Sequence, residues 1–190
     1  MAEDLLLHIC CAPCGGGCVV RLQEEENIRP VLYYSNSNLC DREEFEKRLA
    51  SVKILAEKYG LALAVDPYDH AAWLEAVSGL ENEPERGARC IKCFEFNLKR
   101  AEKKAGESGS AFATTLTVSP LKSSKTIFAI GEKMPGFRAF DFKKKNGYKR
   151  SCDIAAELGF YRQNFCGCEF SKRDNPAYDQ ANAPKEEKEK

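Results

Sequence analysis

The sequence predicts an α/β fold of three layers, a parallel sheet with helices on both faces, followed by a mostly helical C-terminal extension. Short apolar, β-branched or aromatic runs alternate with longer segments of helical periodicity. Strands that alternate with helices form parallel sheets covered on both faces. With 190 residues, 43% of them hydrophobic, the chain is long enough for one well-buried core and short for two. We therefore expect a single α/β domain over residues 1–173.

Each predicted strand is a short run rich in apolar, β-branched or aromatic residues. In order, these runs are residues 5–9, 31–34, 61–65 and 111–116. The helices between them are predicted from apolar residues at helical spacing, and one begins with a capping box formed by Asp41 and Glu44. In order, the predicted helices follow the glycines at 15–17, run from Asp41 to Gly60, and cover residues 71–77 and 90–104. Residues 174–190 are polar without an apolar stripe, which predicts a disordered tail.

Cysteine content and charge narrow the class of protein. The N-terminal segment is acidic and its apolar run is too short for a signal peptide or a membrane span, so a cytoplasmic protein without membrane contact is expected. Ten cysteines in a reducing compartment indicate metal binding or redox chemistry rather than a disulfide framework. The chain has no net charge, but residues 117–173 hold 12 Lys and Arg against 5 Asp and Glu, a formal charge of +7.

Two pairs of cysteines predict a four-thiolate site. Cys10 and Cys11 come directly after the first strand, at the sheet edge where ligands of parallel sheets collect. Cys90 and Cys93 form a C-x-x-C pair at the start of a predicted helix. Four thiolates suit zinc or an iron-sulfur cluster. Because adjacent cysteines match a zinc ribbon poorly, a [4Fe-4S] cluster is favoured over zinc, and the alternative of small buried thiols stays open.

Three further positions near the first strand carry weaker signals. Cys14 is placed to meet the cluster or to hold a second mononuclear iron or other metal, with Asp69 as the candidate carboxylate ligand. Cys18 lies on the predicted helix and is expected to pack in the core. The two histidines, His8 and His70, are expected to be structural hydrogen-bonding residues rather than ligands.

The segment Cys166-Gly167-Cys168 predicts a redox pair. One glycine between two cysteines permits the tight loop that a C-x-C disulfide requires, and a strained disulfide is easily reduced. The alternative is that the two cysteines are further metal ligands. Because Cys10, Cys11, Cys90 and Cys93 already complete one set, redox cycling is the preferred interpretation.

A basic and aromatic stretch at residues 137–150 suggests binding to RNA. Cations bind phosphates and aromatic faces stack on unpaired bases, although a run of charges is more often only a solvated face. A second short stretch, residues 161–164, directly precedes the C-x-C pair. The candidate RNA-binding residues in the two stretches are Lys143, Lys144, Lys149, Arg150, Arg162 and Gln163.

Together, these motifs resemble a known family, the cobalamin-independent epoxyqueuosine reductases, QueH. The resemblance spans residues 5–171. It rests on four segments: His8-Ile9-Cys10-Cys11-Ala12-Pro13-Cys14, Arg89-Cys90-Ile91-Lys92-Cys93-Phe94, residues 112–122 (FATTLTVSPLK) and residues 159–171 (GFYRQNFCGCEFS). The sequence departs from the family pattern at residues 36–39, where Asn-Pro-Asn-Ile is expected, and at Phe45, where tyrosine is usual.

The resemblance implies a reaction, its cofactors and its partners. The reaction is reductive removal of the epoxide oxygen from epoxyqueuosine at the wobble position of tRNA, the last step of queuosine synthesis. It implies a [4Fe-4S] cluster on Cys10, Cys11, Cys90 and Cys93, a redox disulfide between Cys166 and Cys168, and no cobalamin. It also implies a nucleotide-binding fold of the HUP or PP-loop type, which is Rossmann-like. An external electron donor would reset the dithiol, and Asp69 or a nearby tyrosine would supply a proton.

Two other functions remain as alternatives. A tRNA-thiolating PP-loop enzyme with an iron-sulfur cluster shares the fold and the substrate class, but it needs a Ser-Gly-Gly-x-Asp-Ser phosphate loop after the first strand. Residues 13–18 (PCGGGC) hold that place without the serines or the aspartate, so ATP use is not expected. The other alternative is a zinc-stabilised RNA-binding module without catalysis.

Overall fold

The computed structural model describes residues 5–173; residues 1–4 and the predicted tail at 174–190 lie outside the described residues. A four-stranded sheet with strand order β3-β2-β1-β4 forms the centre, and every adjacent pair is parallel. The strands are β1 (Leu5–His8), β2 (Val31–Tyr34), β3 (Leu63–Val65) and β4 (Ala111–Thr114). The predicted α/β fold with a parallel sheet is confirmed.

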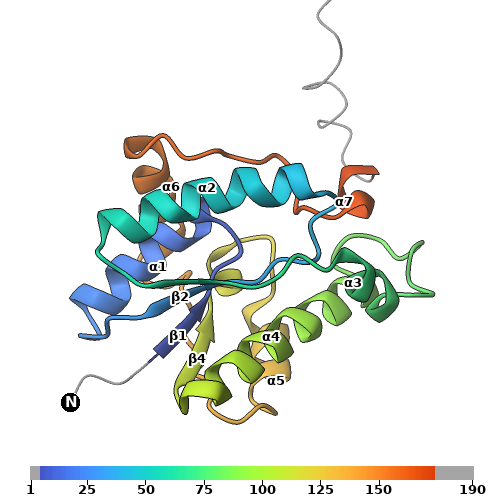
Figure 1. The fold of residues 1–190 in the computed structure, drawn as a ribbon, viewed down its shortest axis with the longest axis horizontal. Helices are drawn as coiled ribbons and strands as arrows, with labels where there is room; N and C mark the ends of the chain where they lie inside the picture. Colours follow the sequence, from blue (N-terminus) through green and yellow to red (C-terminus); the bar gives the residue numbers. More distant parts are fainter. Residues whose placement is uncertain (1–4, 174–190) are drawn as a thin grey trace, which may run out of the picture.

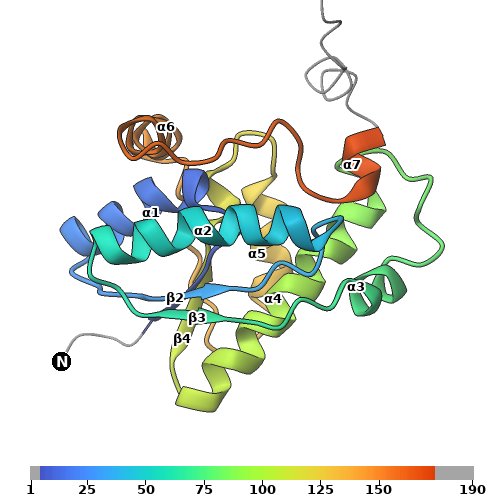
Figure 2. The ribbon, with the colours of Figure 1, turned by 45° about the horizontal axis from the view of Figure 1, so that its top comes forward.

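Helices cover both faces of the sheet and complete three layers (Figures 1 and 2). One face is covered by α1 (Ala12–Glu24), α2 (Arg42–Lys58) and α6 (Gly147–Glu157), and the other by α4 (Ala88–Ser108) and α5 (Ser124–Gly131). Two short helices, α3 (His70–Ala76) and α7 (Glu169–Arg173), lie together beyond the end of the sheet, where the rings of Trp73 and Phe170 are 6.1 Å apart. No helix within residues 5–173 is long and apolar enough to cross a membrane.

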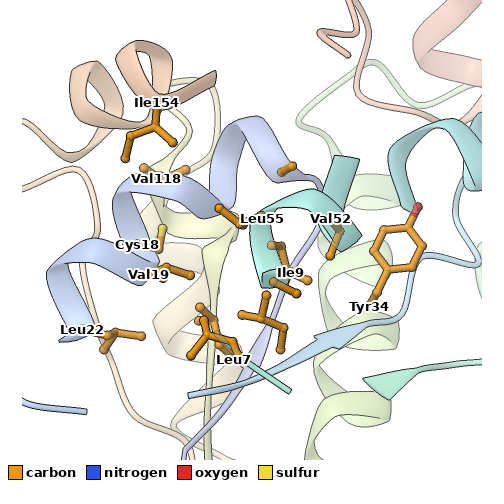
Figure 3. Packing of buried hydrophobic residues seen from close by; sticks show 14 of the residues in the cluster. Leu7, Ile9, Cys18, Val19, Leu22, Tyr34, Val52, Leu55, Val118 and Ile154 are labelled. Atoms are coloured by element: carbon orange, nitrogen blue, oxygen red, sulfur yellow. The ribbon is translucent and has the colours of Figure 1, made fainter. Parts of the chain in front are cut away.

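Alternating side chains of β1 divide the core between the two faces. Leu5 and Leu7, followed by Ile9, pack with the helices α1, α2 and α6, whereas Leu6 packs with α4 and α5. Figure 3 shows Leu7 and Ile9 against Val52 and Leu55 of α2, with Cys18 and Val19 of α1 beside them. Cys18 is fully buried in this cluster, which confirms its predicted core role.

The glycine run at residues 15–17 differs from its predicted place. It does not form a turn before the first helix but lies inside α1, which begins at Ala12. A Cβ on Gly17 would lie 2.6 Å from the backbone oxygen of Gly147 and 2.5 Å from Oγ of Ser151, both on α6. The glycines therefore allow α6 to approach α1 closely. They pack helices together, so they do not form a phosphate-binding loop.

The last predicted strand is shorter than expected, and its end forms part of the site. The sequence predicts a strand over residues 111–116, but β4 ends at Thr114 and the chain continues as the 3₁₀ helix η1 (Thr115–Val118). The side chain of Thr114 caps this turn by accepting a hydrogen bond from the backbone N–H of Leu116 at 3.2 Å. The change of backbone direction brings Thr115 beside Cys10, two residues beyond the end of β1.

Candidate functional site

A cavity of about 760 Å³ lies beyond the carboxyl ends of the strands, the usual ligand position in parallel sheets. Its wall comes from segments far apart in the sequence: the β1–α1 junction, the start of α4, residues 119–123 and residues 162–168. Eight of the ten cysteines line it, and all ten are free thiols. The eight are Cys10, Cys11, Cys14, Cys90, Cys93, Cys152, Cys166 and Cys168. Cysteine is therefore the most frequent residue type in the wall of this cavity.

The tightest sulfur group is made by the β1–α1 junction. Sulfur atoms of Cys10, Cys11 and Cys14 all lie within 4.8 Å of one another, close enough to bind one metal centre. Cys11 is the N-cap of α1 with extended backbone angles, φ −171° and ψ 160°, and a proline stands in the first turn. Because the chain changes from strand to helix at Cys11, adjacent thiols that would point to opposite faces of a strand reach the same space.

Hydrogen bonds within this group separate the acidities of its thiols. The thiol of Cys10 and then that of Cys14 hydrogen-bond to the sulfur of Cys11, and they hold its pKa well below the usual range. The same bond to Cys11 raises the pKa of Cys10 to about 12. Gln163 donates from Nε2 to Cys11 Sγ at 3.1 Å, which also favours the thiolate. Cys11 is thus the sulfur in this group that most readily carries a negative charge.

Cys90 and Cys93 face the same cavity from the start of α4, as the four-thiolate prediction requires. Within the described chain, the group that lies within 4.8 Å contains Cys14 rather than these two. Burial raises the pKa of Cys93, and the nearby Cys166 adds to this shift. Nδ2 of Asn97 approaches Cys93 Sγ at 3.6 Å. One amide N–H donor therefore reaches sulfur in each group, Gln163 at Cys11 and Asn97 at Cys93.

The Cys166-Gly167-Cys168 segment is held through its backbone. Arg48 donates from Nη1 to the carbonyl of Cys166 at 2.9 Å, and Cys40 donates its N–H to the carbonyl of Gly167 at 2.9 Å. Gly167 has φ +139°, and a Cβ there would lie 2.4 Å from Leu39 Cδ2. The glycine is therefore required both by its backbone angle and by the lack of space beside it.

The residue that holds this segment, Arg48, is itself part of a buried ion pair. Its side chain is 3% exposed, and its Nε donates to Oε1 of Glu44 at 2.7 Å. The second carboxylate oxygen of Glu44 accepts from the hydroxyl of Tyr161 at 3.0 Å, and the guanidinium lies over the ring of Phe165. A buried charge pair needs such additional bonds to offset its desolvation. Helix α2 thereby fixes the loop that carries Cys166.

Asp69 lies apart from the sulfur atoms. It is exposed and caps α3, with Oδ1 accepting from the backbone N–H of Ala72 at 3.1 Å. Among residues 5–173 it belongs neither to the cysteine group nor to the cavity wall, so the structure does not bring it to Cys14. The tyrosine that lines the cavity is Tyr148. Both histidines are hydrogen-bonded within the fold, as predicted: His8 to Thr114 and Ser35, and His70 to Ser37 and Glu169.

The residues predicted to bind RNA fall into two groups. Lys149 pairs with Asp153 at 2.7 Å, and Arg150 pairs with Glu24 and Glu25 at the C-terminal end of α1. Lys143 donates to Ser124 and to the carbonyl of Lys122. Lys144 is exposed and forms no ion pair within the described part of the chain. Arg162 and Gln163 instead line the cavity, where Gln163 contacts Cys11. Most charges of the 143–150 stretch are therefore used inside the protein.

Several residues of the site were not predicted from the sequence, and one of them, Arg48, had a detectable signal. Arg48 and Glu44 are four residues apart on the apolar stripe of α2, where an oppositely charged pair stands out. Thr115 was included in a strand, and nothing local to Trp73 or Asn97 points to Cys93. Lys122 lines the cavity, and its electrostatic interaction with the cysteines there, first with Cys166, raises its pKa.

The comparisons with known proteins agree with this sulfur-lined cavity. The model of the family described as "Epoxyqueuosine reductase QueH" matches residues 5–174. The chain belongs to the epoxyqueuosine reductase QueH family. It is similar to the proteins named epoxyqueuosine reductase QueH from Streptococcus pyogenes serotype M1 (34% identity, covering 90% of this chain and 71% of the relative), Acinetobacter baylyi (34%; 91% and 82%) and Thermotoga maritima (32%; 88% and 89%). Family membership identifies it as an oxidoreductase of queuosine biosynthesis.

Proposed function

We propose that the sulfur-lined cavity is the site where this chain reduces epoxyqueuosine to queuosine at the wobble position of tRNA. The epoxide accepts two electrons and two protons, its oxygen leaves as water, and the ring carbons are left joined by a double bond. The main support for the proposal is that eight free thiols line one cavity. The volume of about 760 Å³ suits one extruded nucleoside, the form in which enzymes act on a base.

We assign the cluster ligands to Cys10, Cys11, Cys90 and Cys93, all of which line the cavity. Thiolate sulfur is the donor type that [4Fe-4S] clusters take, so the residues fit the group. Cys14 lies within 4.8 Å of Cys10 and Cys11 and is the remaining sulfur for a second mononuclear iron or other metal. When bound, a cluster would supply single electrons, and an adjacent iron would act as a Lewis acid.

The dithiol of Cys166 and Cys168 is our candidate for the electron pair. Both thiols are free and face the cavity, and the backbone between them is held by Arg48 and Cys40. Oxidation of the two thiols to a disulfide would release two electrons and two protons, the number that the epoxide needs. An external electron donor would then reduce the disulfide before the next turnover.

Turnover of epoxyqueuosine-containing tRNA tests this assignment directly. Protein purified without oxygen is incubated with the tRNA and a reductant, and the nucleosides are separated by mass after digestion. Queuosine should form repeatedly with the wild-type protein. Cys166→Ser and Cys168→Ser should each stop repeated turnover while leaving the absorption of the cluster intact. Undiminished multiple turnover by either variant would remove the dithiol from the reaction.

Metal analysis of the same preparation separates the other functions. Brown protein containing iron and sulfide supports the proposed enzyme, whereas colourless protein with one equivalent of zinc supports an RNA-binding module. A thiolating enzyme would need ATP, and residues 13–18 lie within α1 instead of forming a phosphate loop. ATP-dependent incorporation of sulfur into tRNA would therefore contradict the proposed function.

A further inference from the structure

The cations that line the cavity are not equivalent. Five lysine and arginine side chains line it, and one carboxylate, that of Glu85, accompanies them in the described wall. The five are Arg48, Arg86, Arg89, Lys122 and Arg162. Such an excess of positive charge in the wall of a cavity attracts an anionic ligand. Which of the five can meet that ligand depends on what each already contacts.

Two of the five are engaged inside the protein. Arg48 is buried and bonded to Glu44 and to the carbonyl of Cys166. Arg89 is 1% exposed, lies over the ring of Phe170 and donates to backbone carbonyls between α3 and α4, including that of Glu81 at 3.1 Å. Both hold loops in place. Neither is available to a large ligand that arrives from solvent.

The other three remain available to a ligand. Arg86 and Arg162 are exposed, and Lys122 is half-buried. Over residues 5–173, no carboxylate lies within ion-pair distance of any of the three. They come from three separate segments, the loop before α4, the loop before α5 and the loop between α6 and α7, and all three line the same cavity. We refer to Arg86, Lys122 and Arg162 as the rim cations.

Three of the five cations in the 143–150 stretch, Lys145, Lys149 and Arg150, are already paired with carboxylates. Arg150 reaches Glu24 at 2.5 Å, Lys145 reaches Glu25 at 2.7 Å, and Lys149 reaches Asp153 at 2.7 Å. A cation already paired with a carboxylate gains less from a phosphate, because the existing pair must be broken first. The exposed aromatic side chain of this region that reaches the cavity wall is Tyr148, which is 46% exposed.

We propose that the rim cations, and not the 143–150 stretch, bind the RNA backbone on either side of the nucleotide that enters the cavity. This inference rests on the proposed function for its substrate class. Single-stranded nucleic acid is bound by cations that follow the phosphates and by aromatic faces that stack on bases. Arg86, Lys122 and Arg162 supply the first of these around the cavity, and Tyr148 supplies an aromatic face beside them.

The salt dependence of tRNA binding tests the proposal. Each phosphate contact on a single strand contributes about 0.7 to the slope of log affinity against log salt concentration. Holoprotein binding to an unmodified tRNA transcript is measured by anisotropy at several salt concentrations. The rim variant Arg86→Gln/Lys122→Gln/Arg162→Gln should lower the slope by about 2. The control Lys144→Gln/Lys149→Gln/Arg150→Gln removes the same net charge and should lower it by less than about 0.7.

Two further variants control for misfolding and for any effect of Lys122 on the thiols near it. Arg86→Gln/Arg162→Gln alters only exposed side chains and should lower the slope by about 1.4, and Lys122→Arg should restore the slope lost by Lys122→Gln. The proposal is overturned if the control lowers the slope as much as the rim variant does, or if the rim variant retains the wild-type slope. Failure of the proposed function is a separate result, because it would show as absence of queuosine from the wild-type protein while binding is retained.

Discussion

The two ends of the chain each bring cysteines to the cavity, but they are held there by different means. Cys10, Cys11 and Cys14 lie at the junction of β1 and α1, where the turn from strand to helix brings their sulfur atoms within 4.8 Å of one another. Cys166 and Cys168 flank a glycine in a loop, held by Arg48 of α2 and by the backbone of Cys40.

The difference shows that neighbouring residues fix the geometry of the N-terminal cysteines, whereas residues distant in sequence fix that of the C-terminal pair. The N-terminal group should keep its internal geometry as long as β1 and α1 form, because its spacing is built into that junction. The C-terminal loop should change whenever α2 changes, because its contacts cross more than 100 positions of sequence. Substitutions that weaken one side and spare the other test this view.

Loss of Arg48 should have the largest effect. Arg48→Met leaves the buried Glu44 without its partner, and removing one member of a buried pair costs about 3–5 kcal/mol of unfolding free energy. Urea denaturation measures this cost. Arg42→Met on the same helix breaks an exposed pair with Glu46 at 4.0 Å and a cation–π contact with Tyr68, and it should change stability by about 1 kcal/mol at most. Equal costs for the two variants would contradict the role assigned to Arg48.

Lowering the pH should reduce the free energy of unfolding through protonation of His8, at the end of β1. Burial lowers the pKa of His8 from 6.5 to about 4, and the hydrogen bond to the carbonyl of Ser35 opposes this shift only in part. The unfolded chain therefore binds a proton that the native chain does not, so stability is present above about pH 6.5 and is lost as the pH falls towards 4. The loss should reach about 3 kcal/mol across this window.

The variant His8→Gln isolates this contribution. Its stability should fall less steeply between pH 7 and pH 5 than that of the wild type, by about 1.4 kcal/mol per pH unit at most, whatever its stability at pH 7. The carboxylates titrate in both proteins and cancel in the comparison. Parallel pH profiles in urea denaturation would show that the histidine is not the titrating group.

Gly167→Ala should have a smaller effect that is confined to the C-terminal loop. The new Cβ would meet Leu39 at a backbone φ of +139°, a strain of about 2 kcal/mol. The matched control is Gly106→Ala within α4, where an added Cβ meets no atom within 4 Å and helix propensity should raise stability by about 0.5–1 kcal/mol. Urea denaturation compares the two, and stabilisation by both would show that the loop tolerates a side chain.

Much of the fold could be predicted because its signals are local. The apolar run of β1, the N-cap at Asp41 and the helical spacing after it each depend on neighbouring residues, and the structure has these elements close to their predicted bounds. The other half of the predicted capping box does not form, because the carboxylate of Glu44 bonds to Arg48 and Tyr161. The glycines at 15–17 could not be placed in the same way. Gly16 and Gly17 are required by the close approach of α6, more than 100 residues further along the chain, and Gly15 is required by the side chains of Ile9 and Leu55.

The parallel α/β fold and the candidate cysteines could be predicted before folding was considered, because strand and helix periodicity and the C-x-x-C and C-x-C spacings are properties of neighbouring residues. The charges that remain available to a ligand could not be predicted in this way. The tertiary structure paired Arg150 with Glu24, buried Arg48 against Glu44, turned Gln163 to Cys11 and left the rim cations facing the cavity. A charge in a sequence has no partner until the chain folds, so its role is set by contacts between distant segments.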